Sequence, residues 1–447
     1  MKKGIHRRNF IRTTALAGAG VLVAKPLSPL LAFNGSPGEK VVVGVVGTNS
    51  RGATLANIFA GTTNVEVGYI CDVDENVLNK TLALIEKKTG KRPKGYKDVR
   101  KLLEEKDLDG IAIAAPDHWH APATLMAVKA GKHVYVEKPC CHNPAEGEIL
   151  VKAAEKYKKL IQMGSQRRSF PGVQEAMQAL HEGVIGRVYF SRGWYANARK
   201  PIGTGKIVPV PANLDFELWQ GPAPRREYKD NLVHYNWHWF WNWGTGESLN
   251  NGTHELDVMR WGMGVDYPTK VVSAGGRFGY KDDWETPDTQ TATYEFANNS
   301  AMTWEGRSTN GFNSEGSSRG TIFYGEKGTM VILGGDDYSI YDLGNKLVKD
   351  VKSPLGKIAG GGTLVTGMGD ILDGLHLANF AESIRGTTKL NCPITTGQVS
   401  TLLPQLANIA YRTGRTLYCD TSNGHIKDKE AMKLWDREYE KGWEMKL

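Results

Sequence analysis

Cysteine is scarce in this chain of 447 residues, and no two cysteines form a Cys-x-x-Cys pair. The five cysteines are Cys71, Cys140, Cys141, Cys392 and Cys419. An odd number without that spacing is not typical of the disulfide framework that supports small secreted domains. We therefore expect buried thiols and a fold that depends on hydrophobic cores, for which the length is sufficient for two domains.

Acidic residues are absent from the first 34 positions, which hold six basic residues. Arg7 and Arg8 precede an apolar run from Thr14 to Ala24, a layout typical of a twin-arginine export signal. The run has about ten residues, too few to cross a bilayer core of roughly 30 Å, so stable membrane insertion is disfavoured. We expect residues 1–34 to direct export to the periplasm through the twin-arginine translocase, which carries folded proteins with their cofactors already bound.

The excess of positive charge is largely a property of this N-terminus. The formal net charge is +8, of which six charges belong to the first 34 residues, which leaves +2 on the rest of the chain. A nearly neutral body gives no basis for nucleic-acid binding.

Between Lys40 and Lys156, short β-branched runs alternate with helical stretches. The expected strands are 41–46, 65–70, 111–114 and 134–136, and the expected helices are 53–60, 76–88 and 122–130. This alternation predicts an α/β fold over residues 39–156, a doubly wound parallel sheet of the Rossmann type.

The first expected strand ends in Gly47-Thr-Asn-Ser-Arg-Gly52 and leads directly into a helix. A pyrophosphate needs free backbone N–H groups at a helix start and a turn without side-chain bulk, which the two glycines provide. Asn49 stands where the usual fingerprint has its second glycine, and asparagine tolerates positive φ better than other non-glycine residues. We expect this turn, including Thr48 and Arg51, to bind a nicotinamide dinucleotide.

An acidic residue closes the second expected strand, since Asp72 follows Gly52 by twenty residues. An acid at this place can accept hydrogen bonds from ribose hydroxyls, and it disfavours a 2′-phosphate, so NAD is preferred to NADP. The alternative for Asp72 is a helix cap or turn residue, although Asp74 can cap the next helix equally well.

The fourth expected strand runs into the triplet Glu137-Lys138-Pro139. With the preceding segment from Ala114 to Pro122, this triplet resembles the Gfo/Idh/MocA superfamily, named after glucose-fructose oxidoreductase and inositol dehydrogenase. The resemblance implies that the triplet faces the nicotinamide and that Lys138 is a catalytic residue. A surface lysine is the alternative.

The segment Pro116-Asp-His-Trp-His120 follows the third expected strand. The resemblance implies that Pro116, Asp117 and His120 line the nicotinamide end of the cofactor. A zinc site at His118 and His120 is the alternative, because a strand would put both on one face. No nearby cysteine or carboxylate completes a tetrahedral set, so we expect no metal.

Two later segments extend the resemblance over almost the whole chain after the signal. Gly164-Ser-Gln-Arg-Arg168 contributes Gln166 to the expected cofactor site and Arg168 to the expected substrate site. In the family, the segment corresponding to Gly246 to Asp257 begins a helix in which a histidine follows an aspartate by four residues. His254 matches the histidine, whereas Asn250 replaces the aspartate and cannot accept a proton.

The chemistry of Lys138 and His254 suits the oxidation of an alcohol. A base must take the hydroxyl proton as hydride leaves, and it works best with a pKa near ambient pH. Burial beside a cationic ring lowers the pKa of a lysine, and histidine titrates near neutrality. By resemblance, Lys138 polarises the reacting oxygen and His254 exchanges its proton, and either can be the formal base. A histidine satisfied within the core is the alternative for His254.

After residue 156, period-two runs replace the alternation and predict a second domain, 157–425, of α+β type with a largely antiparallel open sheet. The expected strands are 187–191, 271–279, 289–296, 301–306, 320–325 and 329–333. Helices are expected at 370–385 and 397–413, where they either cover this sheet or return to the first domain.

Residues 234–243 are the densest aromatic stretch of the chain. Sugars present apolar C–H faces that stack on indole rings, so a carbohydrate site is expected here, with Trp239 or Trp241 as the substrate-binding residue and core packing as the alternative. In the tail, 426–447, Met432 and three aromatic residues are spaced like one face of a helix, which we expect to dock on the body or on a second subunit.

These features lead to three hypotheses about function. The first is a sugar or glycoside oxidoreductase that holds NAD tightly and recycles it. The second is a glycosidase of the same superfamily that oxidises, eliminates, hydrates and reduces in turn; the intact Glu-Lys-Pro triplet favours the first over it. The third is a sugar sensor, which would not need both Lys138 and His254. By resemblance we expect a homodimer or homotetramer.

Overall fold

The computed structural model describes residues 40–353, 355 and 368–447. The expected export signal therefore lies outside the described residues. Within the described part, no helix combines the length and the apolar character that a bilayer crossing requires.

A six-stranded, entirely parallel sheet forms the first half, in the strand order β3-β2-β1-β4-β5-β6. Its elements are β1 (Val41–Val46), α1 (Arg51–Phe59), β2 (Val65–Cys71), α2 (Glu75–Thr89), β3 (Lys94–Tyr96), α3 (Val99–Leu102), β4 (Gly110–Ile113), α4 (Asp117–Lys129), β5 (His133–Glu137), α5 (Pro144–Tyr157) and β6 (Ile161–Gly164). The prediction of a doubly wound sheet is confirmed. Because β6 belongs to this sheet, the sheet extends beyond residue 156.

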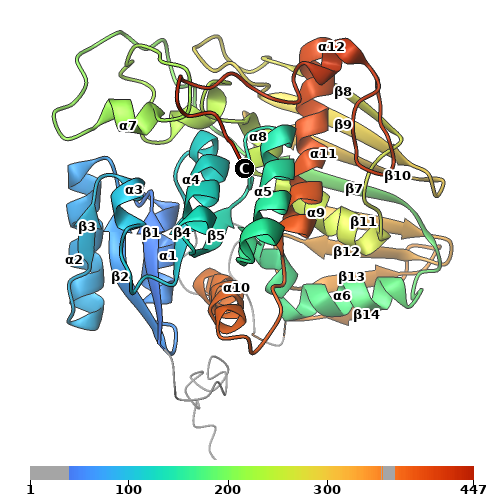
Figure 1. Cartoon of the computed structure of the whole chain (residues 1–447). Helices are drawn as coiled ribbons and strands as arrows, with labels where there is room; N and C mark the ends of the chain where they lie inside the picture. Colours follow the sequence, from blue (N-terminus) through green and yellow to red (C-terminus); the bar gives the residue numbers. More distant parts are fainter. Residues whose placement is uncertain (1–39, 354, 356–367) are drawn as a thin grey trace, which may run out of the picture. The chain divides into compact units, whose positions relative to one another are not determined.

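Both faces of this sheet are covered by helices, as the unbroken apolar run of β1 requires. One face packs on α1 and α2, and the other packs on α4 and α5. The helix α10 (Met368–Ile384) also joins the first face, where Leu377 and Phe380 are fully buried. Of the two expected places for this helix, the structure has the return to the first domain, visible in Figure 1 as the orange helix near the blue α1.

Among the described residues of the second half, nine strands form one sheet, in which only the pair β7–β10 is parallel. Its strands are β7 (Val188–Ala196), β8 (Lys270–Gly276), β9 (Thr289–Phe296), β10 (Ser300–Arg307), β11 (Arg319–Gly325), β12 (Thr329–Leu333), β13 (Tyr338–Tyr341), β14 (Leu347–Val351) and β15 (Leu417–Tyr418). The helices of this half are α6 (Pro171–His181), α7 (Phe216–Gln220), α8 (Gly246–Asn250), α9 (Gly252–Met263), α11 (Ile394–Thr413) and α12 (Lys429–Met432). The prediction of a largely antiparallel sheet is confirmed.

The start of α4 differs from the sequence prediction, because the helix begins at Asp117 and contains Pro122 in its interior. A proline lacks the N–H that would bind the carbonyl four residues earlier, which is that of His118. In the structure this carbonyl oxygen accepts a hydrogen bond from Arg437 Nη2 at 2.9 Å. The tail therefore satisfies the group that the proline leaves free.

The expected helix at the tail is wrong, because α12 ends at Met432 and Gly442 has a φ of +88°. Docking of the tail on the body is nevertheless confirmed. Tyr439 donates a hydrogen bond to Glu146 on α5, and the ring of Trp443 meets that of Trp119 edge-on at 5.2 Å. All five cysteines are buried free thiols, as expected.

Candidate functional site

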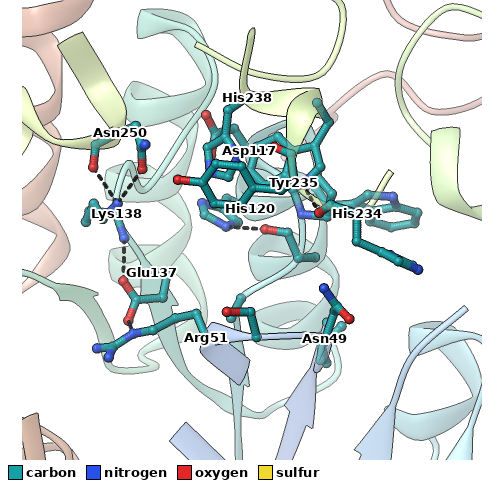
Figure 2. A pocket seen from close by; sticks show the side chains of 18 of the residues that line it. Asn49, Arg51, Asp117, His120, Glu137, Lys138, His234, Tyr235, His238 and Asn250 are labelled. Atoms are coloured by element: carbon teal, nitrogen blue, oxygen red, sulfur yellow. Dashed lines mark hydrogen bonds and ion pairs between the residues drawn. The ribbon is translucent and has the colours of Figure 1, made fainter. Parts of the chain in front are cut away.

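A cavity of about 440 Å³ lies at the carboxyl ends of β1, β2, β4 and β5. In open parallel sheets this edge is where nucleotides bind. Residues from the second half complete the lining, among them Tyr195, Asn250, His254 and Arg319. Figure 2 shows the labelled side chains of both halves around one space. The cavity thus joins the edge of the parallel sheet to the second domain.

The turn after β1 is built for a close approach. Gly47 has a φ of +77°, and a Cβ on it would lie 2.5 Å from the backbone of Ala115. A Cβ on Gly52 would lie 2.0 Å from the carbonyl oxygen of Gly47. Ser50, the residue before α1, makes no side-chain cap, so the first N–H groups of α1 are not bound by it. This arrangement leaves helix donors for an anion at the turn.

Two residues of the expected cofactor site have other roles. Gly52 does not line the cavity; it permits the contact between α1 and the turn. Thr48 is also absent from the lining. It is buried, and its N–H donates a hydrogen bond to Asp72 at 2.6 Å. Contact of these two residues with the cofactor therefore stays a prediction that the lining does not support, whereas Gly47, Asn49 and Arg51 do line the cavity.

Asp72 lies in the cavity wall at the end of β2, and it is 8% exposed. Its carboxylate accepts hydrogen bonds from the N–H groups of Thr48 and Asp74. Burial raises the pKa of Asp72, and these two bonds oppose the rise. Asp74 caps α2, so Asp72 is not the helix cap that was its alternative.

Arg51 lines the cavity while its guanidinium is engaged by two carboxylates. It forms ion pairs with Glu137, at 2.7 Å, and with Asp373 on α10. Gln166 Nε2 donates to the same Glu137 oxygen at 3.0 Å. The carboxylate of Glu137, next to Lys138, is thus held from two sides, and Asp373 is a member of the site that no sequence pattern indicated.

Lys138 reaches from the end of β5 to the second half of the molecule. Its Nζ donates to the backbone oxygen of Asn250 at 2.5 Å and to the side-chain oxygen of Asn250 at 3.1 Å (Figure 2). Burial lowers the pKa of Lys138, against the opposing effects of Glu137 and Asp117. The surface-lysine alternative is therefore wrong.

His254 enters the cavity from α9 and is 3% exposed. Its Nε2 atom has no hydrogen-bond partner among the described residues. Burial, with a further contribution from the positive charge of Arg319, holds the pKa of His254 well below its usual value. The residue type predicts titration near neutrality, but the lowered pKa keeps the imidazole of His254 neutral at pH 7. Because its Nε2 atom has no hydrogen-bond partner among the described residues, the alternative of a histidine satisfied within the core is wrong.

The helix expected to carry both Asn250 and His254 is interrupted at Asn251, between α8 and α9. Asn250 and His254 are therefore not neighbours on one continuous helix face, although both line the cavity. A Cβ on Gly252 would lie 2.8 Å from the indole of Trp304, so the first residue of α9 must be small.

Pro116, Asp117 and His120 line the cavity, as the resemblance implies. They lie at the start of α4 and not on a strand. The ring nitrogens of His120 are 2.6 Å from the Pro139 oxygen and 2.8 Å from the Ala115 oxygen, and burial raises the pKa of Asp117. His118 Nε2 is 2.9 Å from the backbone oxygen of Trp219. Among the described residues, no three histidine, cysteine or acidic side chains are grouped to hold a metal ion.

Three of the expected substrate residues lie outside the cavity lining. Arg168 forms a two-pronged ion pair with the buried Asp257, which holds its guanidinium in the core. Trp239 is 1% exposed and stacks on Trp284 at 3.9 Å. The ring of Trp241 lies under the guanidinium of Arg412. The lining of this cavity thus gives no support to the assignment of these three residues to substrate binding, which stays a prediction.

The aromatic stretch 234–243 does contribute to the cavity, but through other members. The 3₁₀ turn Asn236–Trp239 turns Trp237 and His238 toward the cavity and Trp239 toward the core. His238 stacks on Trp237 at 3.6 Å, and burial lowers the pKa of His238 to about 3. The composition of the sequence identified this aromatic stretch, but only the geometry of the turn decides which of its side chains line the cavity. Tyr235 of the stretch also lines the cavity, and further lining residues that the sequence did not indicate are Tyr195, Asn197, Arg199 and Arg319.

Comparison with protein families agrees with this architecture. Residues 41–165 match the Gfo/Idh/MocA model for an oxidoreductase family with an NAD-binding Rossmann fold. Residues 200–331 match the model for the C-terminal alpha/beta domain of the same family. The chain therefore carries both domains of the Gfo/Idh/MocA oxidoreductase family.

Among curated proteins, similar relatives are named glycosyl hydrolase family 109 proteins. The one from Saccharopolyspora erythraea is 31% identical over 210 residues, which are 42% of this chain and 45% of that protein. The one from Shewanella pealeana is 30% identical over 180 residues, 36% of this chain and 39% of that protein. The matched region spans less than half the length of these relatives.

Solved structures share the fold over most of the chain. The WlbA dehydrogenase from Bordetella pertussis, in complex with NADH and UDP-GlcNAcA, aligns with a TM-score of 0.62 at 18% identity and covers 86% of this chain and 99% of that one. Levoglucosan dehydrogenase, in complex with NADH and levoglucosan, aligns with a TM-score of 0.65 at 17% identity, over 85% and 99%. At these identities the likeness shows the fold.

Proposed function

We propose that this protein is an NAD-dependent oxidoreductase that acts on a secondary alcohol of a sugar or glycoside. The observation that carries the proposal is the meeting of Lys138 and His254 in one cavity at the nucleotide-binding edge of the parallel sheet. The two side chains come from different halves of the molecule. Two nitrogen groups that exchange protons, beside a dinucleotide turn, suit the removal of hydride and proton from an alcohol.

The residues of the first half fit an NAD molecule. Gly47 keeps the turn free of side-chain bulk, α1 offers N–H donors for the diphosphate, and Asp72 stands where ribose hydroxyls bind. The carboxylate of Asp72 would repel a 2′-phosphate, which favours NAD over NADP. When bound, the nicotinamide would supply the hydride acceptor.

Lys138 is suited to hold the reacting oxygen. Two of its Nζ hydrogens point to the oxygens of Asn250, which fixes the direction of the third. We place the substrate oxygen on that third hydrogen. His254 is neutral, and its Nε2 atom is unbound among the described residues, so it can accept the hydroxyl proton. Tyr235, Trp237 and His238 would contact the rest of the sugar.

A redox glycosidase is the second candidate, and the names of the curated relatives favour it. In such a reaction the same cavity oxidises a glycoside, eliminates the aglycone, adds water and reduces the product, so NAD is regenerated without net change. The same two proton carriers would serve the oxidation and the reduction. The intact Glu137-Lys138-Pro139 triplet, which favours the dehydrogenase, and the relatives' names therefore point in different directions.

One experiment separates the two. The purified protein with its bound nucleotide is supplied with a panel of free sugars and aryl glycosides, and both NADH absorbance and product identity are followed. A keto-sugar with reduction of NAD supports the oxidoreductase. Release of free sugar without net reduction supports the glycosidase. Sugar binding without any product would reject both and leave a sensor.

We also propose export through the twin-arginine pathway and assembly into a homodimer or homotetramer. The first is supported by Arg7 and Arg8 followed by a short apolar run. The second is supported by apolar side chains on the sheet of the second half, where Tyr189 is 44% exposed and Val272 is 40% exposed. Fractionation of the natural host and light scattering of the purified protein test the two.

A further inference from the structure

The segment 213–243, here called the strap, leaves the second domain and forms a small apolar core of its own. Its buried members include Leu214, Phe216, Trp219, Trp237 and Trp243. Because these residues pack on one another, the strap is a folded body and not a loose loop. Figure 1 shows it with α7 above the blue elements.

One end of the strap is attached beside β2. The N–H of Asp215 donates to the oxygen of Val73 at 3.0 Å, and the N–H of Glu75 donates to the oxygen of Asn213 at 2.9 Å. The carboxylate of Asp74 adds two side-chain contacts. Its Oδ2 accepts from Asn213 Nδ2 at 2.8 Å and lies 2.9 Å from His234 Nε2.

The strap is also attached to α4, through residues near both of its ends. The N–H of His118 donates to the oxygen of Trp243 at 3.1 Å, and Trp119 Nε1 donates to the oxygen of Trp219 at 2.9 Å. Gly221 lies so near the Trp119 ring that a Cβ on it would be 2.1 Å from the ring. The strap is therefore bound firmly on this side.

The two attachments lie on opposite sides of the dinucleotide turn. In the sheet β1 stands between β2 and β4, and α4 follows β4. A segment attached at β2 and at α4 consequently crosses the carboxyl end of β1. Six residues of the strap line the cavity that Asp72 also lines: Leu218, Trp219, His234, Tyr235, Trp237 and His238.

We propose that the strap closes over the adenosine half of a bound dinucleotide and that Asp74 is its latch. This inference rests on the proposed function, and it adds that the nucleotide leaves only when the latch opens. The protein would then keep one cofactor molecule through many turnovers. Cofactor retention in this protein is thus a property of the strap, in addition to the contacts of the turn.

The two carboxylate oxygens of Asp74 make different contacts, so a substitution can remove one set of contacts and keep the other. Oδ1 caps α2 by accepting from the N–H groups of Asn76 and Val77, whereas Oδ2 makes the latch. Asp74→Asn keeps a cap oxygen and replaces the latch oxygen by an amide that cannot accept from Asn213. Asn213→Ala is a second variant, which removes one latch bond and leaves the cap untouched.

Asp428 offers a matched control. Its Oδ1 caps α12 through the N–H groups of Glu430 and Ala431, and its Oδ2 pairs with Arg415 at 2.8 Å. Asp428 does not line the cavity. Asp428→Asn therefore repeats the chemical change of Asp74→Asn, cap and ion pair included, at a site without the strap.

The experiment loads each protein with NADH and follows its release into an excess of NAD by fluorescence. We expect release to be about tenfold faster in Asp74→Asn and about threefold faster in Asn213→Ala, because bonds to a charged group are lost. In Asp428→Asn the rate should stay at the wild-type value. Protease cleavage within the strap should become faster in the first two variants only.

The outcomes distinguish the inference from the function on which it rests. Equal release rates in wild type, Asp74→Asn and Asn213→Ala would overturn the latch and leave the proposed function standing. A wild-type protein that binds neither NADH nor NAD would overturn the proposed function and the latch together. Faster release in Asp428→Asn as well would show a general loosening and would also overturn the latch.

Discussion

Lys138 and His254 both line the cavity, but their nitrogen groups have different surroundings. Lys138, from the parallel sheet, has its amine bound by two oxygens of Asn250. His254, from the second domain, presents an Nε2 atom without a partner among the described residues. Burial lowers the pKa of both groups. In the proposed reaction the amine is therefore oriented in advance by Asn250, whereas no hydrogen bond from the described residues competes for Nε2 of the imidazole.

Removal of the amine is the largest perturbation of this pair. Lys138→Ala should lower kcat by about a thousandfold or more, because general acid–base contributions reach that size. The bound nucleotide should stay, since the turn, Asp72 and the strap are unchanged. Single-turnover kinetics and the ratio of nucleotide to protein measure the two effects. The exposed Lys106→Ala is the control. Loss of nucleotide in Lys138→Ala would reassign the lysine to cofactor binding.

Titration of the imidazole sharpens the same comparison. A histidine of ordinary pKa would switch off a base-dependent reaction as the pH falls through about 6.5. Because the folded protein holds the pKa of His254 well below that value, the imidazole stays neutral at lower pH. We expect kcat/KM to keep its plateau from pH 7 down past 6.5, with a further acid limb removed in His254→Gln. A fall centred at 6.5 in the wild type would contradict this account.

A carboxylate at position 250 tests how the amine is held. Asn250→Asp puts a negative charge where the amide oxygen is now 3.1 Å from Lys138 Nζ. A nearby opposite charge favours the ammonium form, so the pKa of Lys138 should rise by about one unit or more. The basic limb of the kcat profile should move to higher pH by the same amount. Asn76→Asp on the exposed surface of α2 controls for the change in net charge. If the basic limb of the kcat profile does not move in Asn250→Asp, the side chain at position 250 does not set the pKa of the group that titrates there.

The smallest expected effects separate the two neighbouring tryptophans of the aromatic stretch. Trp237→Phe should raise KM for the sugar several-fold, because this ring lines the cavity, and it should also lower Tm, because the same ring belongs to the apolar core of the strap. Trp239→Phe should leave KM unchanged and lower the stability by about 1–3 kcal/mol, because its ring is buried against Trp284. Steady-state kinetics and thermal unfolding of the two variants give the answer. The reverse pattern would return Trp239 to the substrate site.

The two domains and most strands of the molecule were predictable from local patterns. The strands 289–296 and 329–333 agree with β9 and β12 at both ends, because alternating side chains mark one buried face. The helix α4 was misplaced by five residues, because its interior proline is tolerated through a hydrogen bond from Arg437 in the tail. Such a distant partner leaves no trace near Pro122 in the sequence.

The candidate site, like the fold, was predictable from local sequence patterns only in part. The sequence by itself determined the dinucleotide turn, Asp72 and Lys138, because each follows a strand of a parallel sheet and such strand ends share one edge. Only the tertiary structure decided that Arg168 pairs with Asp257, that Trp237 and not Trp239 faces the cavity, and that Asp373 binds Arg51. Those choices depend on which side chains meet across long chain separations, and local periodicity carries no information about such meetings.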